Sequence, residues 1–106
     1  MIVIEVIFEA LPGKRRALVD LARRTMMDSR QEHGCVLYRF TSHIDCADRV
    51  SLIELWETES DLRAHFQGEP FKHFFAQLPK IGVPVAHMAW EGHLNFYIPP
   101  IEETNG

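Results

Sequence analysis

The sequence is poor in cysteine: it has only Cys35 and Cys46, and no Cys-x-x-C pair. Two cysteines do not make the disulfide framework of a small secreted domain, so we expect both to be free thiols. No apolar stretch approaches the ~20 residues that cross a bilayer, and the first ten residues lack the basic start of a signal peptide. These absences predict a cytoplasmic protein without a membrane partner.

Basic residues are also scarce relative to acidic ones, 11 against 15, which gives a formal net charge of −4. A nucleic-acid-binding domain shows the opposite excess, so we expect no nucleic acid partner. The sequence contains no G-x-S-x-G, P-loop or G-x-G-x-x-G motif, and no Cys–His arrangement with the spacing of a nucleophile and its base. Hydrolase, kinase and nicotinamide-dependent chemistry therefore find no support.

Six histidines raise the question of a metal site. His87 and His93 fall on one face of an expected strand, but six positions separate them by roughly 20 Å at ~3.3 Å per residue. No carboxylate–histidine spacing of a known metal site joins His65 to His73. We therefore expect no metal site within one chain, while a site shared between two chains stays open.

Alternating and helical apolar patterns predict the secondary structure. We expect helices at 15–33 and, in two pieces, at 58–78, and strands at 2–10, 35–44, 49–57 and 85–97. Gly34 stands where a left-handed helix cap belongs, and Thr58-x-x-Asp61 has the spacing of a capping box. This order predicts an α+β domain over residues 1–98, with the ferredoxin-like βαββαβ fold and an antiparallel four-stranded sheet, followed by a tail at 99–106.

Both faces of the expected sheet carry apolar side chains. One face would hold Val36, Tyr38, Phe40, Met88 and Trp90, and the opposite parity includes Val3, Ile7, Cys35, Leu37, Ile53, Leu55, Val85 and Ala89. A sheet covered on one side alternates apolar residues with polar ones. Because large exposed apolar patches are rare on monomers, we expect two sheets to face each other in a two-fold homodimer.

Four short motifs carry a resemblance to a known family: LPGK after the first strand, EHGCVLYRF into the second, LIELWET on the third, and AHFQGEPFKHF across the helical segment. In this order, over residues 2–92, the chain resembles the antibiotic biosynthesis monooxygenase (ABM) family. The resemblance implies a dimeric α+β barrel with one pocket per subunit between sheet and helices. It also implies, as in many members, oxygenation of phenolic or polycyclic aromatic compounds by O₂ with no cofactor, neither metal, flavin nor haem.

The chain departs from the family pattern in places. Pro70 stands where a His usually precedes the Phe of the second helical segment. Haem-degrading relatives use an Asn–Trp–His set, and the corresponding positions here are Val6, His65 and Phe75. The resemblance therefore argues against haem degradation.

A cofactor-free oxygenase needs an apolar pocket, hydrogen bonds to a substrate anion, and a base whose pKa lies near the working pH. His65 borders the apolar stripe of its helix and is the first catalytic candidate, with a structural hydrogen-bonding role as the alternative. Glu54 is the second, because a carboxylate among apolar strand neighbours is costly unless it is paired or its pKa is raised. Pairing with Arg39 across the hairpin is the other interpretation of Glu54.

Aromatic side chains supply the candidate substrate-binding residues. Trp56 is either a stacking wall for an aromatic ring or plain core. Tyr38 offers a pocket hydroxyl, and Phe71 and Phe74 belong to an apolar stripe at helical spacing. His73 is offset from that stripe, so we expect it to be more exposed and rank it last.

The favoured function is oxygenation of a small aromatic, phenolic or quinol-type compound by a homodimer. Since one scaffold hosts unrelated activities, three alternatives stay open. An isomerase acting through an enediol could use the same base without oxygen. A non-catalytic ligand-binding or stress-response dimer would use the pocket without turnover, and a haem-binding protein is the third alternative.

Overall fold

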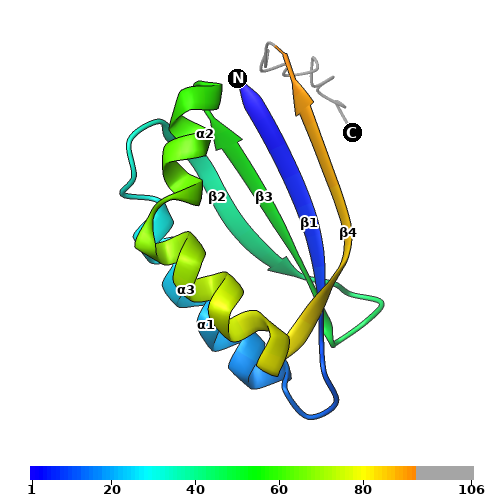
Figure 1. Cartoon of the computed structure of the whole chain (residues 1–106). Helices are drawn as coiled ribbons and strands as arrows, with labels where there is room; N and C mark the ends of the chain where they lie inside the picture. Colours follow the sequence, from blue (N-terminus) through cyan, green and yellow to red (C-terminus); the bar gives the residue numbers. More distant parts are fainter. Residues whose placement is uncertain (93–106) are drawn as a thin grey trace, which may run out of the picture.

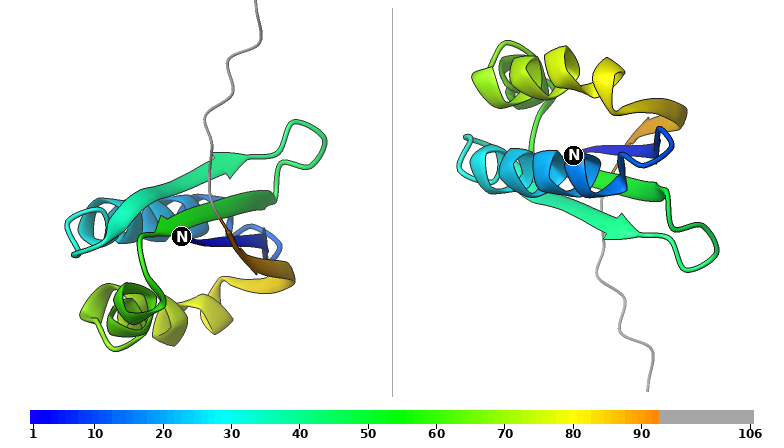
Figure 2. Two further views of the ribbon diagram at one scale, coloured as in Figure 1. Left: turned by 90° about the horizontal axis from the view of Figure 1, so that it is seen from above. Right: turned by 90° about the horizontal axis from the view of Figure 1, so that it is seen from below.

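The computed structural model describes residues 1–92 of the chain. Its elements are β1 (Ile2–Ala10), α1 (Arg15–Ser29), β2 (Cys35–Ser42), β3 (Arg49–Trp56), α2 (Glu59–Phe66), α3 (Glu69–Gln77), the short 3₁₀ helix η1 (Leu78–Lys80) and β4 (Gly82–Glu91). The strands form one antiparallel sheet in the order β2-β3-β1-β4, and the helices lie on one face of it (Figures 1 and 2). This confirms the ferredoxin-like α+β fold, with a pair of helices in the second helical position.

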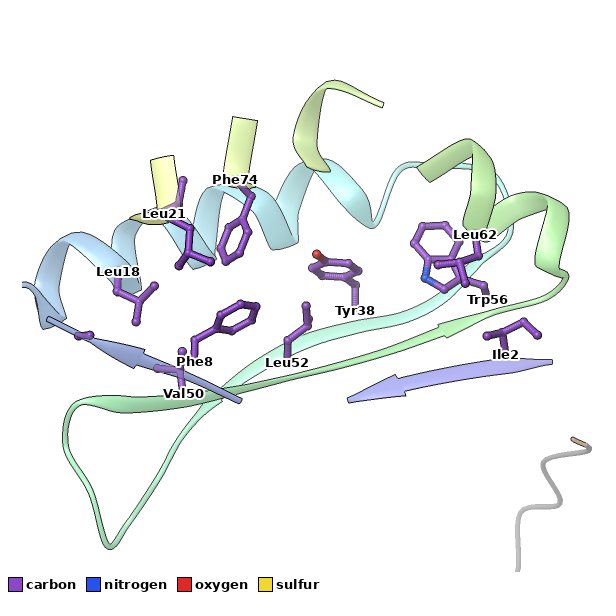
Figure 3. Packing of buried hydrophobic residues seen from close by; sticks show 12 residues of the cluster. Ile2, Phe8, Leu18, Leu21, Tyr38, Val50, Leu52, Trp56, Leu62 and Phe74 are labelled. Atoms are coloured by element: carbon purple, nitrogen blue, oxygen red, sulfur yellow. The ribbon is translucent and has the colours of Figure 1, made fainter. Parts of the chain in front are cut away.

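The hydrophobic core lies between this sheet and its helices (Figure 3). Every second residue of a strand faces the helices, which brings Phe8, Leu52 and Trp56 to the same side. Leu18 and Leu21 of α1, at i and i+3, close the core from above. Phe8 and Trp56 are 0% exposed, and burial of a side chain of this size stabilises the fold by about 1.5–3 kcal/mol.

Helix α1 ends earlier than predicted. Its last residue is Ser29, and the chain then makes a tighter turn in which the Glu32 N–H donates to the Ser29 carbonyl over 3.1 Å. Gly34 does adopt the left-handed conformation, with φ of 78°, but it closes this turn into β2 instead of capping the helix. The prediction that the helix runs to residue 33 is therefore wrong, while the glycine's conformation is confirmed.

Strand β4 starts three residues before the predicted position. Gly82 opens it because a Cβ there would lie 2.9 Å from the carbonyl oxygen of Glu9 on β1. Pro84 is tolerated inside the strand because β4 is at the edge of the sheet and the pairing with β1 is irregular at this point. Outside the described residues lie His93, the rest of the predicted strand at 93–97 and the predicted tail at 99–106.

The predicted assignment of β4 side chains to sheet faces is wrong. The register pairs Met88 and Trp90 with the β1 residues that point away from the helices, and it pairs Ala89 with the helix-facing Ile4. Met88 and Trp90 therefore lie on the face opposite Tyr38. Sequence alternation separates the two parities of a strand, but it does not say which parity faces the helices.

A similar correction applies to the start of β2. An irregularity between Cys35 and Leu37 pairs Cys35 with Trp56, so Cys35 packs on the helix side and not on the opposite one. Both cysteines are free, as predicted. Burial raises the pKa of the Cys35 thiol to about 11, so this thiol stays protonated near neutral pH.

The sheet face turned away from the helices, called the outer face below, is rich in apolar side chains. It carries Ile7, Leu37, Ile53, Leu55, Met88 and Trp90. Met88 and Trp90 are 53% and 46% exposed, and the helices of the described residues lie on the opposite face of the sheet (Figure 2). None of these helices has the length and apolar character needed to cross a membrane.

Candidate functional site

A cavity of about 370 Å³ lies between the helix side of the sheet and the α2–α3 pair. Small-molecule sites in proteins typically measure ~300–1,000 Å³. The lining is mostly apolar and comes from the inner strands β1 and β3 of the sheet (Ile4, Val6, Phe8, Leu52), the helices (Phe66, Phe71, Phe74, Phe75) and the edge strand β4 (Pro84, Ala89). Met88 also borders the cavity, although the register turns its side chain to the outer face. Three polar residues complete it: Tyr38, Glu54 and His87.

The aromatic wall of the cavity follows from the sequence of α3. Gly68 and Pro70 end α2 and start a new helix, with Pro70 in its first turn. Phe71 and Phe75, at i and i+4, then stack along α3 with ring centroids 4.7 Å apart. Phe66, from the end of α2, continues the wall at 4.9 Å from Phe71.

Glu54 and Tyr38 face the cavity side by side because the register pairs them across β2 and β3. Glu54 is only 5% exposed, and Trp56 Nε1 donates a hydrogen bond to its Oε1 over 2.8 Å. Burial raises the pKa of the Glu54 carboxyl, against the smaller opposing effects of this hydrogen bond and of His65. The predicted partner, Arg39, is exposed on the other face of the sheet, so that pairing is wrong.

Burial likewise raises the pKa of Tyr38, so its hydroxyl stays protonated and can donate a hydrogen bond. Tyr38 is 3% exposed and rises from the sheet toward α1 (Figure 3). A neutral donor and a carboxyl with a raised pKa therefore stand together in an apolar cavity.

His65 is buried behind the cavity and not in its lining. Its ring lies 4.6 Å from the Trp56 ring and 5.5 Å from the Phe71 ring, measured between centroids. Its Nδ1 is 2.6 Å from Oε1 of Glu32, and its Nε2 is 3.7 Å from Oε1 of Glu54. His65 therefore stands between two carboxyl groups, one in the cavity wall and one outside it.

The structure brings most of the predicted site residues together. Glu54, Tyr38, Phe71 and Phe74 line the cavity. His65 and Trp56 lie directly behind Glu54, and the full burial of Trp56 leaves no surface for stacking on a ligand. His73 is separate: it is exposed on α3 in a polar depression next to α1.

Two residues of this region were not identified from the sequence. Glu32 was assigned to the helix at 15–33, and nothing in the local pattern indicates that the turn after Ser29 directs its carboxylate at His65. His87 was considered only as a metal ligand. Its alternation with Ala89 does place it on the helix side once the register is known, and it lines the cavity.

The described residues contain no group of three or more His, Cys, Asp or Glu side chains arranged to hold a metal ion. Within the cavity, the titratable side chains are Glu54, Tyr38 and His87. Such a site can exchange protons with a bound molecule, hold an anion through the Tyr38 hydroxyl, and surround an aromatic ring with other rings.

Comparison with known proteins agrees with this architecture. The family model described as "Antibiotic biosynthesis monooxygenase" matches residues 1–77. No curated protein matches the chain.

Solved structures resemble it over nearly its whole length. One from Deinococcus radiodurans, provisionally named an antibiotic biosynthesis monooxygenase, has a TM-score of 0.86 at 18% identity and covers 94% of this chain and 100% of its own. A Nitrosomonas europaea protein with the same provisional name gives 0.80 at 19% identity, over 87% and 98% of the two chains. A Mycobacterium tuberculosis protein gives 0.77 at 22% identity, over 98% of both. Identities this low establish the shared fold alone.

Proposed function

This chain belongs to the antibiotic biosynthesis monooxygenase family, and from that premise we propose that it oxygenates a small phenolic or quinol-type aromatic compound with O₂, without a cofactor. The observation that carries the proposal is the apolar cavity of about 370 Å³ with the buried Glu54 carboxyl in its wall. An apolar enclosure suits a planar aromatic guest. The single carboxyl suits removal of one proton from it.

The proposed chemistry begins with that proton. Glu54 accepts it from the substrate, and its raised pKa brings it closer to the pKa of a weakly acidic phenol or anthrone than that of a solvated carboxylate. The Tyr38 hydroxyl donates to the resulting oxyanion. The electron-rich anion then reduces O₂ and a carbon–oxygen bond forms. The peroxide anion takes back the proton held by Glu54, and breakage of the O–O bond and of the remaining C–H bond on the same carbon releases water and leaves a carbonyl. One oxygen atom enters the product and the other leaves as water, so the substrate supplies all the electrons.

His65 and Trp56 support Glu54 from behind in this proposal. Trp56 Nε1 fixes one carboxyl oxygen at 2.8 Å, and His65 approaches the same oxygen to 3.7 Å. The sequence-based interpretation made His65 the base. The geometry favours Glu54 instead, because Glu54 lines the cavity and His65 does not.

The proposal includes a homodimer formed through the outer face. Ile53 and Leu55 of the inner strand β3 lie at its centre, and Met88 and Trp90 extend it along β4. A second copy that packs its own outer face here would remove this apolar surface from water. The cavity would stay on the opposite side of each sheet.

Oxygen uptake tests the function. We expect chelator-treated protein to consume O₂ with at least one member of a panel of quinols and anthrone-type phenols, and Glu54→Gln to lower kcat/KM by about 100-fold or more. Glu57→Gln, an exposed carboxylate three residues along the chain, is the matched control and should keep full activity. Formation of product under strict anaerobiosis would contradict the oxygenase proposal and favour an isomerase. Binding of panel compounds without turnover would leave a ligand-binding protein.

A further inference from the structure

Three ionisable side chains form a line that leads away from the cavity. Glu54 stands in the cavity wall, His65 lies behind it, and Glu32 lies beyond His65 in the turn after α1. Their side chains are 7%, 1% and 23% exposed, so the line starts in the interior and reaches solvent at Glu32. Glu32 does not line the cavity.

We propose that Glu32 and His65 form a proton path that connects Glu54 with solvent while a bound molecule fills the cavity. The proposal deepens the proposed function, since it rests on Glu54 as the group that exchanges a proton with the substrate. It does not depend on the oxygen chemistry that follows. In this path Glu32 and His65 are positioning and relay residues, and neither touches the substrate.

The geometry supplies one short link and one longer one. The 2.6 Å contact between His65 Nδ1 and Glu32 Oε1 is a strong hydrogen bond of the charge-assisted kind. The 3.7 Å between His65 Nε2 and Glu54 Oε1 exceeds hydrogen-bonding distance by about 0.5 Å. Such contacts commonly tighten only when a substrate is bound. Both ring nitrogens of His65 therefore face a carboxyl group.

Proton transfer along this line balances without any further reactant. Glu54 receives the substrate proton on a carboxylate oxygen and passes it to Nε2 of His65. The Nδ1–H of the same ring moves to Glu32, and Glu32 releases a proton to water. Each group returns to its starting charge, one proton has moved from the cavity to solvent, and His65 now carries its proton on Nε2. The reverse sequence, from Glu32 through Nδ1 and Nε2 to Glu54, restores the Nδ1–H form and returns the proton that the peroxide needs to lose water.

The neighbouring ionisable groups do not interrupt this path. On β2, burial keeps the Tyr38 hydroxyl and the Cys35 thiol protonated by raising the pKa of each. Arg30, at the end of α1, donates its Nε–H to the Tyr38 carbonyl over 2.9 Å. His87 of β4 lines the same cavity as Glu54, and α3 contributes the uncharged Phe71 ring next to His65.

The turn between α2 and α3 leaves room for the outer end of the path. A Cβ on Gly68 would lie 2.7 Å from Oε2 of Glu32. The absence of a side chain at this position lets the Glu32 carboxylate reach His65. Gly68→Ala is therefore expected to displace that carboxylate while the helices on either side keep their sequence.

The variant Glu32→Gln distinguishes a role of Glu32 in proton transfer from a purely structural role as the hydrogen-bond acceptor of His65. The amide oxygen still accepts a hydrogen bond from Nδ1–H, but the amide cannot take up a proton in this pH range. The readout is the infrared carbonyl band of protonated Glu54, identified by its loss in Glu54→Gln. Its rise is followed after a laser-induced pH drop from a caged proton donor, in the free protein and with 2-naphthol added. Glu57→Gln is the control.

With 2-naphthol bound, we expect Glu54 to gain its proton at least about tenfold more slowly in Glu32→Gln than in the unaltered protein or in Glu57→Gln. Equal rates would overturn the proposal, since protons would then reach Glu54 through the cavity mouth. In Glu32→Ala, added formate can occupy the vacated space and should restore the rate. A slow Glu32→Ala that formate leaves unchanged would also count against the relay. Because no turnover is measured, a failure of the oxygenase proposal leaves this result readable.

Discussion

At the scale of single residues, the surroundings of Glu54 determine both its pKa and its effect on the stability of the protein. Its carboxyl accepts one hydrogen bond, from Trp56 Nε1, and it faces a mostly apolar cavity with the His65 ring behind it. Burial therefore favours the neutral form and raises the pKa of Glu54. Compared with the unfolded chain, the native state favours the protonated form of Glu54. The stability that this preference confers is full below the ordinary pKa of 4.5 and is lost as the pH rises through the native pKa.

Glu54→Gln should remove this pH dependence. The amide stays neutral and can still accept the Trp56 hydrogen bond. We expect the variant to become more stable relative to the unaltered protein as the pH rises from 4 to 8, so that its free energy of unfolding minus that of the unaltered protein increases. Urea unfolding at a series of pH values measures the difference, with Glu57→Gln as a control for the loss of one negative charge. If the difference in the free energy of unfolding between the two proteins does not vary with pH, burial does not raise the pKa of Glu54.

Two glycines in left-handed conformations provide a second test at this scale. Gly13 and Gly34 have φ of 75° and 78°, so an alanine at either position costs about 1–3 kcal/mol of backbone strain. A Cβ on Gly13 meets no atom within 4 Å, whereas one on Gly34 would lie 2.2 Å from the Asp61 carboxyl. Thermal unfolding should therefore show a larger loss for Gly34→Ala than for Gly13→Ala. Equal losses of thermal stability in the two variants would mean that the Asp61 side chain moves away from the new Cβ without destabilising the protein.

At the scale of elements, short sequence patterns correctly predicted those features that depend on neighbouring residues only. The capping box of Thr58 and Asp61 is present: Thr58 Oγ1 accepts a hydrogen bond from the Asp61 N–H and starts α2. The apolar stripe of α3 places Phe74 in the core, and the alternation of β1 correctly groups Ile2 and Phe8 on one face. These patterns involve residues that are close in sequence, so they can be recognised without knowing the tertiary structure.

The elements also show where sequence reasoning could not succeed. The position of Glu32 depends on a turn that packs against α2 and α3. The contact of Glu32 with His65 therefore cannot be predicted from the residues near it in sequence. The faces of β4 depend on its register with β1, which includes an irregularity beside Phe8. His87 was missed for the same reason, because its place in the cavity wall follows from that register.

The cap of α2 can be tested on its own. Thr58→Ala removes the acceptor of the Asp61 N–H and should lower the free energy of unfolding by about 1 kcal/mol. Ser60→Ala, in the exposed first turn of the same helix, is the matched control and should have almost no effect. Chemical denaturation of the two variants decides the point, and equal effects would show that the Thr58 hydroxyl does not stabilise the helix.

At the scale of the whole molecule, the two faces of the sheet have different tasks in this account. The helix side encloses the cavity, and the outer face is proposed to pair with a second copy. Light scattering should then give about twice the chain mass of 12.3 kDa. Leu55→Lys places a charge at the centre of the outer face and should yield monomers, whereas Ser60→Lys should not. A monomeric unaltered protein would contradict this arrangement.

The central claim is that the cavity beside Glu54 is where an aromatic molecule binds. The most direct measurement is a crystal structure of the protein soaked with 2-naphthol, compared with Ala89→Trp, which adds a large side chain to the cavity wall. We predict naphthol among Phe66, Phe71 and Phe74, with its hydroxyl within hydrogen-bonding distance of Glu54 and with no such density in Ala89→Trp. Naphthol bound elsewhere, or a cavity left empty at saturating naphthol, would contradict the claim.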